Sequence, residues 1–241
     1  MQTRTAWIDA SHPMANRKMW GLTILERNIR ELEKLGCNRI YIATTAGNDP
    51  LSHFCQPLPK GLTVSLETTA PGDPFAKLLV LMQETGTRVL LIEGHALNDR
   101  RVLKKMLAAS RDVVAIGNIG KNPGVAACLS RDSLGFLDGQ MATTLPELAE
   151  KAAASGTISL LDLTKIDPYI ENLRREIPPY LMRIESEAQF QEAESVLELT
   201  VHKGVNDFVA KYVHPPLEFG IVRLIQYTQI TPNQVTIFWL I

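Results

Sequence analysis

The chain has 241 residues, of which 45% are hydrophobic and 21% are charged, as in an ordinary globular protein. Lys and Arg together number 25 against 26 for Asp and Glu, so no net field favours nucleic acid as a partner. Three widely spaced cysteines, Cys37, Cys55 and Cys128, form neither a disulfide framework nor a zinc-binding pattern, and they indicate a reducing compartment.

From residue 1 to about residue 200, short apolar runs alternate with stretches of helical spacing. The expected strands are 6–8, 39–43, 62–66, 88–92, 112–116, 125–129 and 180–184. The expected helices are 22–35, 73–85, 99–109, 145–155, 168–175 and 187–199. This alternation predicts a three-layer α/β domain, in which helices cover both faces of a mostly parallel central sheet.

Two features of this domain bear on where a ligand would bind. Ligands of such sheets lie beyond the carboxyl ends of the strands, which points to the loops after Ile8, Ala43, Leu66 and Ile92. The segment 117–124 is rich in Gly and Asn, and we favour a hairpin connection there over a phosphate loop.

The last forty residues differ from the rest. We expect a helix over 216–227 whose apolar stripe lies on a membrane surface, with Arg223 reaching lipid headgroups. The stripe consists of Leu217, Ile221, Leu224 and Ile225. Its alternative partners are the α/β body or a second copy of the chain in a homodimer.

A second helix is expected from about residue 232, because Thr231 suits an N-cap and Pro232 a first helical position. The apolar run 237–241 follows, whereas a membrane span needs roughly 20 apolar residues. We interpret this segment as the opening of a span, and a buried C-terminal helix is the alternative.

This segment resembles the entry to the first membrane helix of the CDP-alcohol phosphatidyltransferases. The resemblance rests on Lys203-Gly204, Asp207 and the run Thr231-Pro232-Asn233-Gln234-Val235-Thr236. It implies that 201–241 is a juxtamembrane segment of an integral-membrane parent, at the cytoplasmic face, and that the chain stops inside the first span. The family's signature Asp-x-x-Asp-Gly-x-x-Ala-Arg does not occur here, so the phosphotransfer site is expected elsewhere.

Four stretches of the body resemble nucleotidyltransferases of the sugar-phosphate and MobA-like type. They are 6–10, 22–36, 89–103 and 183–193. The resemblance implies a Rossmann-like nucleotidyltransferase domain over 1–200. The nucleotide-binding candidates that it suggests are Asp9, Ala10, Ser11, Arg17 and Lys18. Asp73 is a further candidate because it lies at a strand-to-helix turn near the expected ligand face, and helix capping is the alternative role for it. Mg²⁺ and CTP are expected only if this site is active, and no other cofactor is expected.

The chain departs from this family at positions that matter for chemistry. The loop 9–18 has no glycine to let backbone amides approach phosphates, so Arg17 and Lys18 either reach a phosphate or are solvated. The family's metal aspartates fall on His95 and on or beside Arg183, and neither side chain suits Mg²⁺. Glu93 or Asp99 is the candidate substitute at the first position and Glu185 at the second.

These departures predict a catalytically degenerate domain. Such a domain would position the membrane phosphatidyltransferase, pair protomers, or hold a nucleotide or a CDP-alcohol that it does not itself make. One alternative is an active CTP-dependent cytidylyltransferase that makes the CDP-alcohol donor. Another is a soluble α/β enzyme unrelated to membranes.

Overall fold

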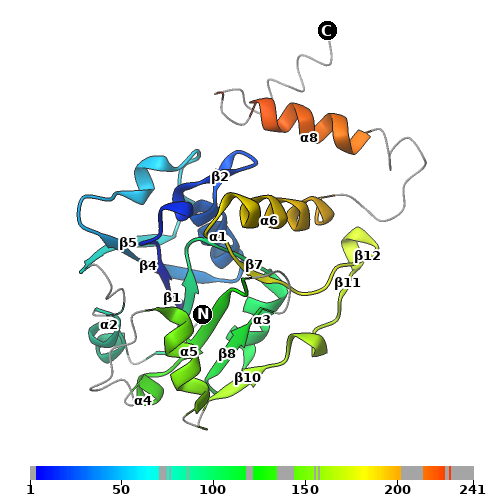
Figure 1. Ribbon diagram of the computed structural model, residues 1–241. Helices are drawn as coiled ribbons and strands as arrows, with labels where there is room; N and C mark the ends of the chain where they lie inside the picture. The colour runs from blue at the N-terminus through cyan, green and yellow to red at the C-terminus, as the bar shows by residue number, and fades with distance from the viewer. Residues whose placement is uncertain are drawn as a thin grey trace.

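The computed structural model describes residues 4–70, 75, 77–85, 87–117, 122–134, 144–154, 156, 158–201, 214–225 and 228. Side-chain environments are described for all of these except 84–85, 134, 152–153, 214–218 and 225. Figure 1 shows a central sheet with helices on both sides and a further helix, α8, beside α6.

Within the described residues, seven strands form one sheet in the order β10-β8-β9-β6-β1-β4-β5. Their bounds are β1 Arg4–Asp9, β4 Cys37–Thr45, β5 Thr63–Thr69, β6 Val89–Glu93, β8 Val113–Ile116, β9 Val125–Leu129 and β10 Ser159–Leu161. All neighbours are parallel except β9, which runs antiparallel to both β6 and β8. The mostly parallel α/β fold predicted from the sequence is therefore confirmed.

Helices cover the two faces of this sheet. Their bounds are α1 Ile24–Lys34, α2 Leu78–Thr85, α3 Arg100–Ala108, α4 Arg131–Leu134, α5 Leu145–Ala154, α6 Glu187–Leu199 and α8 His214–Ile225. One buried cluster joins α1 and α3 to one face, and a second joins α2 and α5 to the other. Trp7 belongs to the second cluster and Ile8 to the first, as expected for neighbours in a strand buried on both sides.

A smaller layer lies over the α1 side. The pair β7 (Ala96–Asn98) and β13 (Leu181–Arg183) is antiparallel, and it packs with α6 in a third buried cluster. The side chain of Ser186 accepts a hydrogen bond from Gln189 N, and the Gln189 side chain accepts one from Ser186 N. The expected capping box is therefore present at the start of α6. The short pair β2 (Lys18–Met19) and β3 (Leu22–Thr23) precedes α1.

Four single-turn 3₁₀ segments and one more short pair complete the described elements. They are η1 Pro13–Asn16, η2 Pro50–His53, η4 Leu163–Lys165, η5 Glu171–Leu173, β11 Tyr169–Ile170 and β12 Arg175–Glu176.

The helix predicted over 168–175 is wrong. Asp167 Oδ1 accepts a hydrogen bond from Tyr169 N, and a single 3₁₀ turn follows. Arg174 then takes the left-handed conformation, with φ 51°, which reverses the chain so that Tyr169 faces Glu176. The helix predicted from residue 22 begins two residues later, because Thr23 is its N-cap and its side chain accepts from Glu26 N.

The connection between β8 and β9 joins antiparallel neighbours, in agreement with the predicted hairpin. Residues 118–121 at its tip lie outside the described residues.

Phe219 and Arg223 of helix α8 contact the body. The Phe219 ring stacks on Trp20 at 5.0 Å, and Arg223 pairs with Glu194 at 2.9 Å and Glu198 at 3.2 Å. Arg223 is therefore engaged by α6 rather than free as the sequence suggested. Ile221 and Leu224 of the expected stripe remain 48% and 77% exposed. Leu217 and Ile225 lie within α8, but their side chains are outside the described part.

The membrane-entry segment lies outside the described residues: Lys203, Gly204, Asp207 and 231–241 are not covered. Among the helices that are described, none combines the length and the hydropathy that crossing a bilayer requires.

Candidate functional site

A cavity of about 350 Å³ opens where the carboxyl ends of β1, β5 and β6 meet. Its described lining residues are Asp9, Ser11, His12, Thr69, Ala70, Glu93, His95, Thr144, Leu145, Pro146, Arg183 and Glu185. This is the edge of the sheet where a parallel α/β fold places its ligands.

The pairing of β1 with β6 brings the first two acidic residues together. Asp9 and Glu93 are partners in the parallel register and each ends its strand. Gly94 then turns the chain, and its N–H donates to Asp9 O at 2.7 Å. A Cβ on Gly94 would lie 2.8 Å from that oxygen, so only glycine fits this approach.

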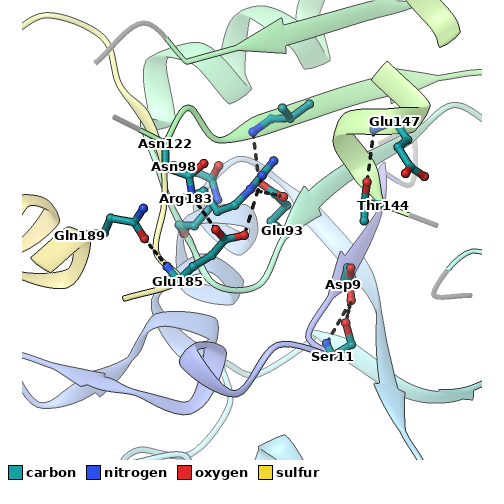
Figure 2. A network of polar contacts seen from close by, with 12 residues as sticks. Asp9, Ser11, Glu93, Asn98, Asn122, Thr144, Glu147, Arg183, Glu185 and Gln189 are labelled. Atoms are coloured by element: carbon teal, nitrogen blue, oxygen red, sulfur yellow. Dashed lines mark hydrogen bonds and ion pairs between the residues drawn. The ribbon is translucent and has the colours of Figure 1, made fainter. Parts of the chain in front are cut away.

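Arg183 lies between two carboxylates (Figure 2). Its Nε donates to Glu93 Oε1 at 2.8 Å, and its Nη1 is 3.9 Å from Glu185 Oε1. Val125 N donates to the second Glu93 oxygen at 3.2 Å, and Asn122 Nδ2 donates to Glu185 Oε2 at 2.8 Å. Glu93 and Glu185, the predicted metal candidates, thus meet in space, but a guanidinium already occupies the position between them.

The environment of Glu93 opposes its ionisation. Its side chain is 4% exposed, against 45% for Glu185. Burial is the largest influence and raises the pKa of Glu93 to about 7, while Arg183 and the amide of Val125 act in the opposite direction. The pair needs its hydrogen bonds because an unpaired buried charge is costly.

His95 lies beside this cluster and stacks on His12, with ring centroids 4.5 Å apart. Burial first, then His12 and Arg183, lower the pKa of His95 to about 3, so its imidazole is neutral at pH 7. Its Nδ1 is buried without a hydrogen-bond partner. His95 therefore lines the cavity as a neutral ring, and the hydrogen-bonding capacity of its buried Nδ1 is unused.

The loop after β1 uses its backbone amides internally. Ala10 N donates to Ala43 O, Ser11 N to Asp9 Oδ1, Met14 N to His12 Nδ1, and Ala15 N to His12 O. The 3₁₀ turn η1 closes on itself in this way. These amides are not available to phosphate oxygens.

The remaining sequence candidates lie away from the cavity lining. Arg17 pairs with Glu187 at 3.1 Å and lies over the Phe190 ring, and Lys18 is in β2. Ala10 is fully buried. Asp99 caps α3 and pairs with Arg101 at 2.7 Å, so it is not placed to substitute for a metal ligand.

Asp73 lies outside the described residues. The polar residues of the described site that were not candidates from the sequence are His12, Thr69, Thr144 and Asn122. Thr144 accepts from Glu147 N at the start of α5, and this Thr-x-x-Glu capping pattern was readable in the sequence.

Mg²⁺, which the resemblance implies, does not fit the residues present. Within the described part of the chain, no three His, Cys, Asp or Glu side chains are grouped so as to hold a metal ion. The two best-placed carboxylates are joined to Arg183 instead, and guanidinium is not a ligand.

No protein-family model and no curated protein matches the sequence. Solved structures do match. UDP-glucose pyrophosphorylase from Acinetobacter baumannii superposes with a TM-score of 0.58 over 92% of this chain and 99% of that chain, at 10% identity. The inositol-1-phosphate CTP transferase from T. maritima gives a TM-score of 0.55 over 85% and 98%, at 13% identity.

The 2-C-methyl-D-erythritol 4-phosphate cytidylyltransferase from Thermus thermophilus gives a TM-score of 0.53 over 81% of this chain and 98% of that chain, at 14% identity. The chain has the nucleotidyltransferase fold. At these identities the likeness extends to the fold and not to the reaction.

Proposed function

We propose that this domain holds a ligand in the cavity at Asp9, Glu93 and Arg183 without catalysing metal-dependent nucleotidyl transfer. The observation that carries the proposal is the ion pair of Arg183 with Glu93, at 2.8 Å, where the fold family would need a metal-binding carboxylate pair. A fixed guanidinium neutralises Glu93 but leaves no open coordination position for phosphate oxygens.

The charge around the cavity supports this proposal. In its described lining, Arg183 is the single guanidinium and is paired with Glu93, which leaves the carboxylates of Asp9 and Glu185 in excess. A nucleoside triphosphate would meet this negative surface without a metal ion to offset it, and the amides of Ala10, Ser11, Met14 and Ala15 are already bonded. The lining suits uncharged polar groups, such as sugar hydroxyls, a nucleobase or an alcohol, and a diphosphate that joins such groups brings less negative charge than a triphosphate.

A CDP-linked alcohol is the ligand class we favour. Two of the structural neighbours, the inositol-1-phosphate CTP transferase and the methylerythritol-phosphate cytidylyltransferase, are named for reactions with CTP or a cytidylyl group. Together with the phosphatidyltransferase-like segment, this supports a domain that holds the donor beside a membrane-embedded CDP-alcohol phosphatidyltransferase, at its cytoplasmic face. The anchoring and any pairing of protomers are parts of this proposal.

An active cytidylyltransferase is the second candidate. The observation in its favour is that Glu93 and Glu185 lie on either side of one cationic group at the expected end of the sheet. If Arg183 swung away on substrate binding, both carboxylates would face the cavity.

Pyrophosphate release separates these candidates. The protein is incubated with CTP, Mg²⁺ and a panel of phosphoalcohols, with the T. maritima inositol-1-phosphate CTP transferase as the assay's positive control. We expect no release above background, because loss of metal carboxylates removes several kcal/mol of transition-state stabilisation, more than about a thousandfold in rate. Robust release that Glu93→Gln or Glu185→Gln abolishes would establish the active enzyme instead.

Ligand binding itself is tested by calorimetry with CDP-glycerol, with cytidine and with CTP, each in Mg²⁺ and in EDTA. We expect CDP-glycerol to bind with an affinity that Mg²⁺ does not change, and CTP to bind more weakly. Binding that requires Mg²⁺ would contradict the proposal.

A further inference from the structure

A second cavity, of about 440 Å³, lies between α1, the C-terminal part of α6 and the junction of β7 with α3. It shares no lining residue with the cavity at Glu93 within the described chain. Its walls include Arg27 and Glu31 of α1, and Asp99, Arg100 and Arg101 at the start of α3.

The charges of this second cavity do not balance. Glu31 is engaged by Lys34 at 3.0 Å and by Arg100 at 2.6 Å. Asp99 is engaged by Arg101 at 2.7 Å. Among the described residues, no carboxylate lies within ion-pair distance of Arg27, and Glu31 and Glu26 act on its charge only from beyond that distance, so its guanidinium is the one cation of the described lining without an ion pair.

Arg27 is also held in place with hydrogen-bonding capacity unused. One terminal nitrogen donates to Met19 O at 2.9 Å, which fixes the side chain, while its Nε is buried without a partner. Burial lowers the pKa of Arg27, which reflects the cost of keeping this charge out of water. Guanidinium groups that are shielded from water are normally paired, so the partly buried Arg27, which lines a cavity without an ion pair, is suited to an anionic ligand.

Asn98 supplies a second and independent observation in the same cavity. It is 6% exposed, and its Nδ2 donates to Asn28 Oδ1 at 3.1 Å and to Ala96 O at 3.3 Å. Because both of those partners are acceptors, they fix the orientation of the amide. The Oδ1 of Asn98 is left buried without a donor, so it could accept a hydrogen bond from a hydroxyl or N–H group of a ligand.

We propose that this second cavity binds a small phosphorylated polyol. The phosphate would pair with Arg27, and a hydroxyl of the same molecule would donate to Asn98 Oδ1. An anion and a donor on one small molecule satisfy both unpartnered groups, whereas inorganic phosphate satisfies the charge and a neutral polyol only the acceptor. This site does not depend on the function proposed for the first cavity.

Calorimetry on the full chain with three probes tests this assignment: glycerol 3-phosphate, inorganic phosphate and glycerol. We expect affinity to fall in that order. Arg27→Gln, which keeps a polar side chain but removes the charge, should weaken glycerol 3-phosphate binding by about tenfold or more. Arg39→Gln is the matched control, because Arg39 is exposed and lines neither cavity.

A second variant guards against a folding defect in Arg27→Gln. Arg27→Lys keeps the positive charge at the same position, so it should bind glycerol 3-phosphate more tightly than Arg27→Gln. Absence of binding to the wild type at about 10 mM probe would overturn the proposal. Equal affinity of Arg27→Gln and Arg39→Gln would overturn it too.

Discussion

Arg183 determines what the first cavity can do. A single guanidinium between Glu93 and Glu185 turns two candidate metal ligands into ion-pair partners. The hydrogen bond from Val125 N to Glu93 Oε2 then leaves neither oxygen of that carboxylate uncommitted. The described cation in this polar cavity is the Arg183 guanidinium, which belongs to the protein and cannot be exchanged as a metal ion can.

His95 offers a test of this environment through pH. Its pKa is lowered from 6.5 to about 3 in the folded protein, so the unfolded chain binds the proton first as pH falls. The stability conferred by the neutral ring is complete above pH 6.5 and is lost between there and pH 3. Replacing the ring with a residue that does not titrate should remove this loss.

We therefore expect His95→Phe to lose less stability than the wild type when pH is lowered from about 7.5 to about 5, by roughly 2 kcal/mol. Urea unfolding at the two pH values measures the difference. His53→Phe is the control, because His53 is exposed and should leave the pH dependence unchanged. Identical pH profiles for His95→Phe and the wild type would show that His95 is not held neutral.

At the scale of elements, the site depends on how closely β1 and β6 approach at their ends. The N–H of Gly94 bonds Asp9 O at 2.7 Å, and a Cβ there would lie 2.8 Å from that oxygen and 3.2 Å from Ala10 Cα. These neighbours are backbone atoms, so they cannot rotate away as a side chain would.

Gly94→Ala should therefore lower the free energy of unfolding by about 1–3 kcal/mol, because strand ends must shift to admit the methyl group. Gly220→Ala in α8 is the contrasting control. No atom lies within 4 Å of its added Cβ, and alanine should stabilise the helix by about 0.5–1 kcal/mol. Chemical denaturation of both variants gives the two values, and equal stability of Gly94→Ala and wild type would contradict the packing described.

Helix α8 is held to α6 by few contacts, so its docking should be easy to break. Arg223→Glu places a third carboxylate against Glu194 and Glu198 and replaces attraction with repulsion. Amide hydrogen exchange over 214–225 should become faster, whereas Arg39→Glu on the exposed end of β4 should leave it unchanged. Unaltered exchange in Arg223→Glu would mean that these ion pairs do not hold the helix.

The regular elements were the predictable part of the molecule. Apolar spacing and caps located α1, α3 and α6 because local sequence determines both. The helix prediction for 168–175 failed because the left-handed conformation of Arg174 and the pairing of Tyr169 with Glu176 determine the structure of this segment. Neither is visible in the periodicity.

For the whole molecule, the fold could be predicted from the sequence, whereas the chemistry of the site depends on side-chain contacts that the sequence does not show. Sequence resemblance and structural superposition agree on the nucleotidyltransferase fold. The sequence also indicated Asp9, Glu93, His95, Arg183 and Glu185, all of which line one cavity. It could not show that the Arg183 side chain joins Glu93 to Glu185, because side-chain direction depends on long-range packing of β13 against β7.

Membrane binding by the C-terminal segment can be tested by flotation with lipid vesicles. We expect the full chain to float with vesicles of phosphatidylcholine and phosphatidylglycerol, and a version ending at Val201 to stay in solution. The double change Ile221→Asp and Leu224→Asp should reduce flotation, because both side chains are exposed on α8 and available to lipid. Equal flotation of the full and shortened chains would show that this segment is not the membrane contact.

Manganese binding, measured by the loss of the free Mn²⁺ resonance signal on adding protein, tests whether Arg183 takes the place of a metal ion in the first cavity. The wild type should bind no Mn²⁺ in the first cavity, because Arg183 occupies the position between Glu93 and Glu185. Arg183→Asp should create a site with carboxylates suited to a hard divalent cation, and Arg183→Gln should not. Mn²⁺ binding by the wild type that Glu93→Gln abolishes would contradict the claim that this guanidinium has taken the place of the metal.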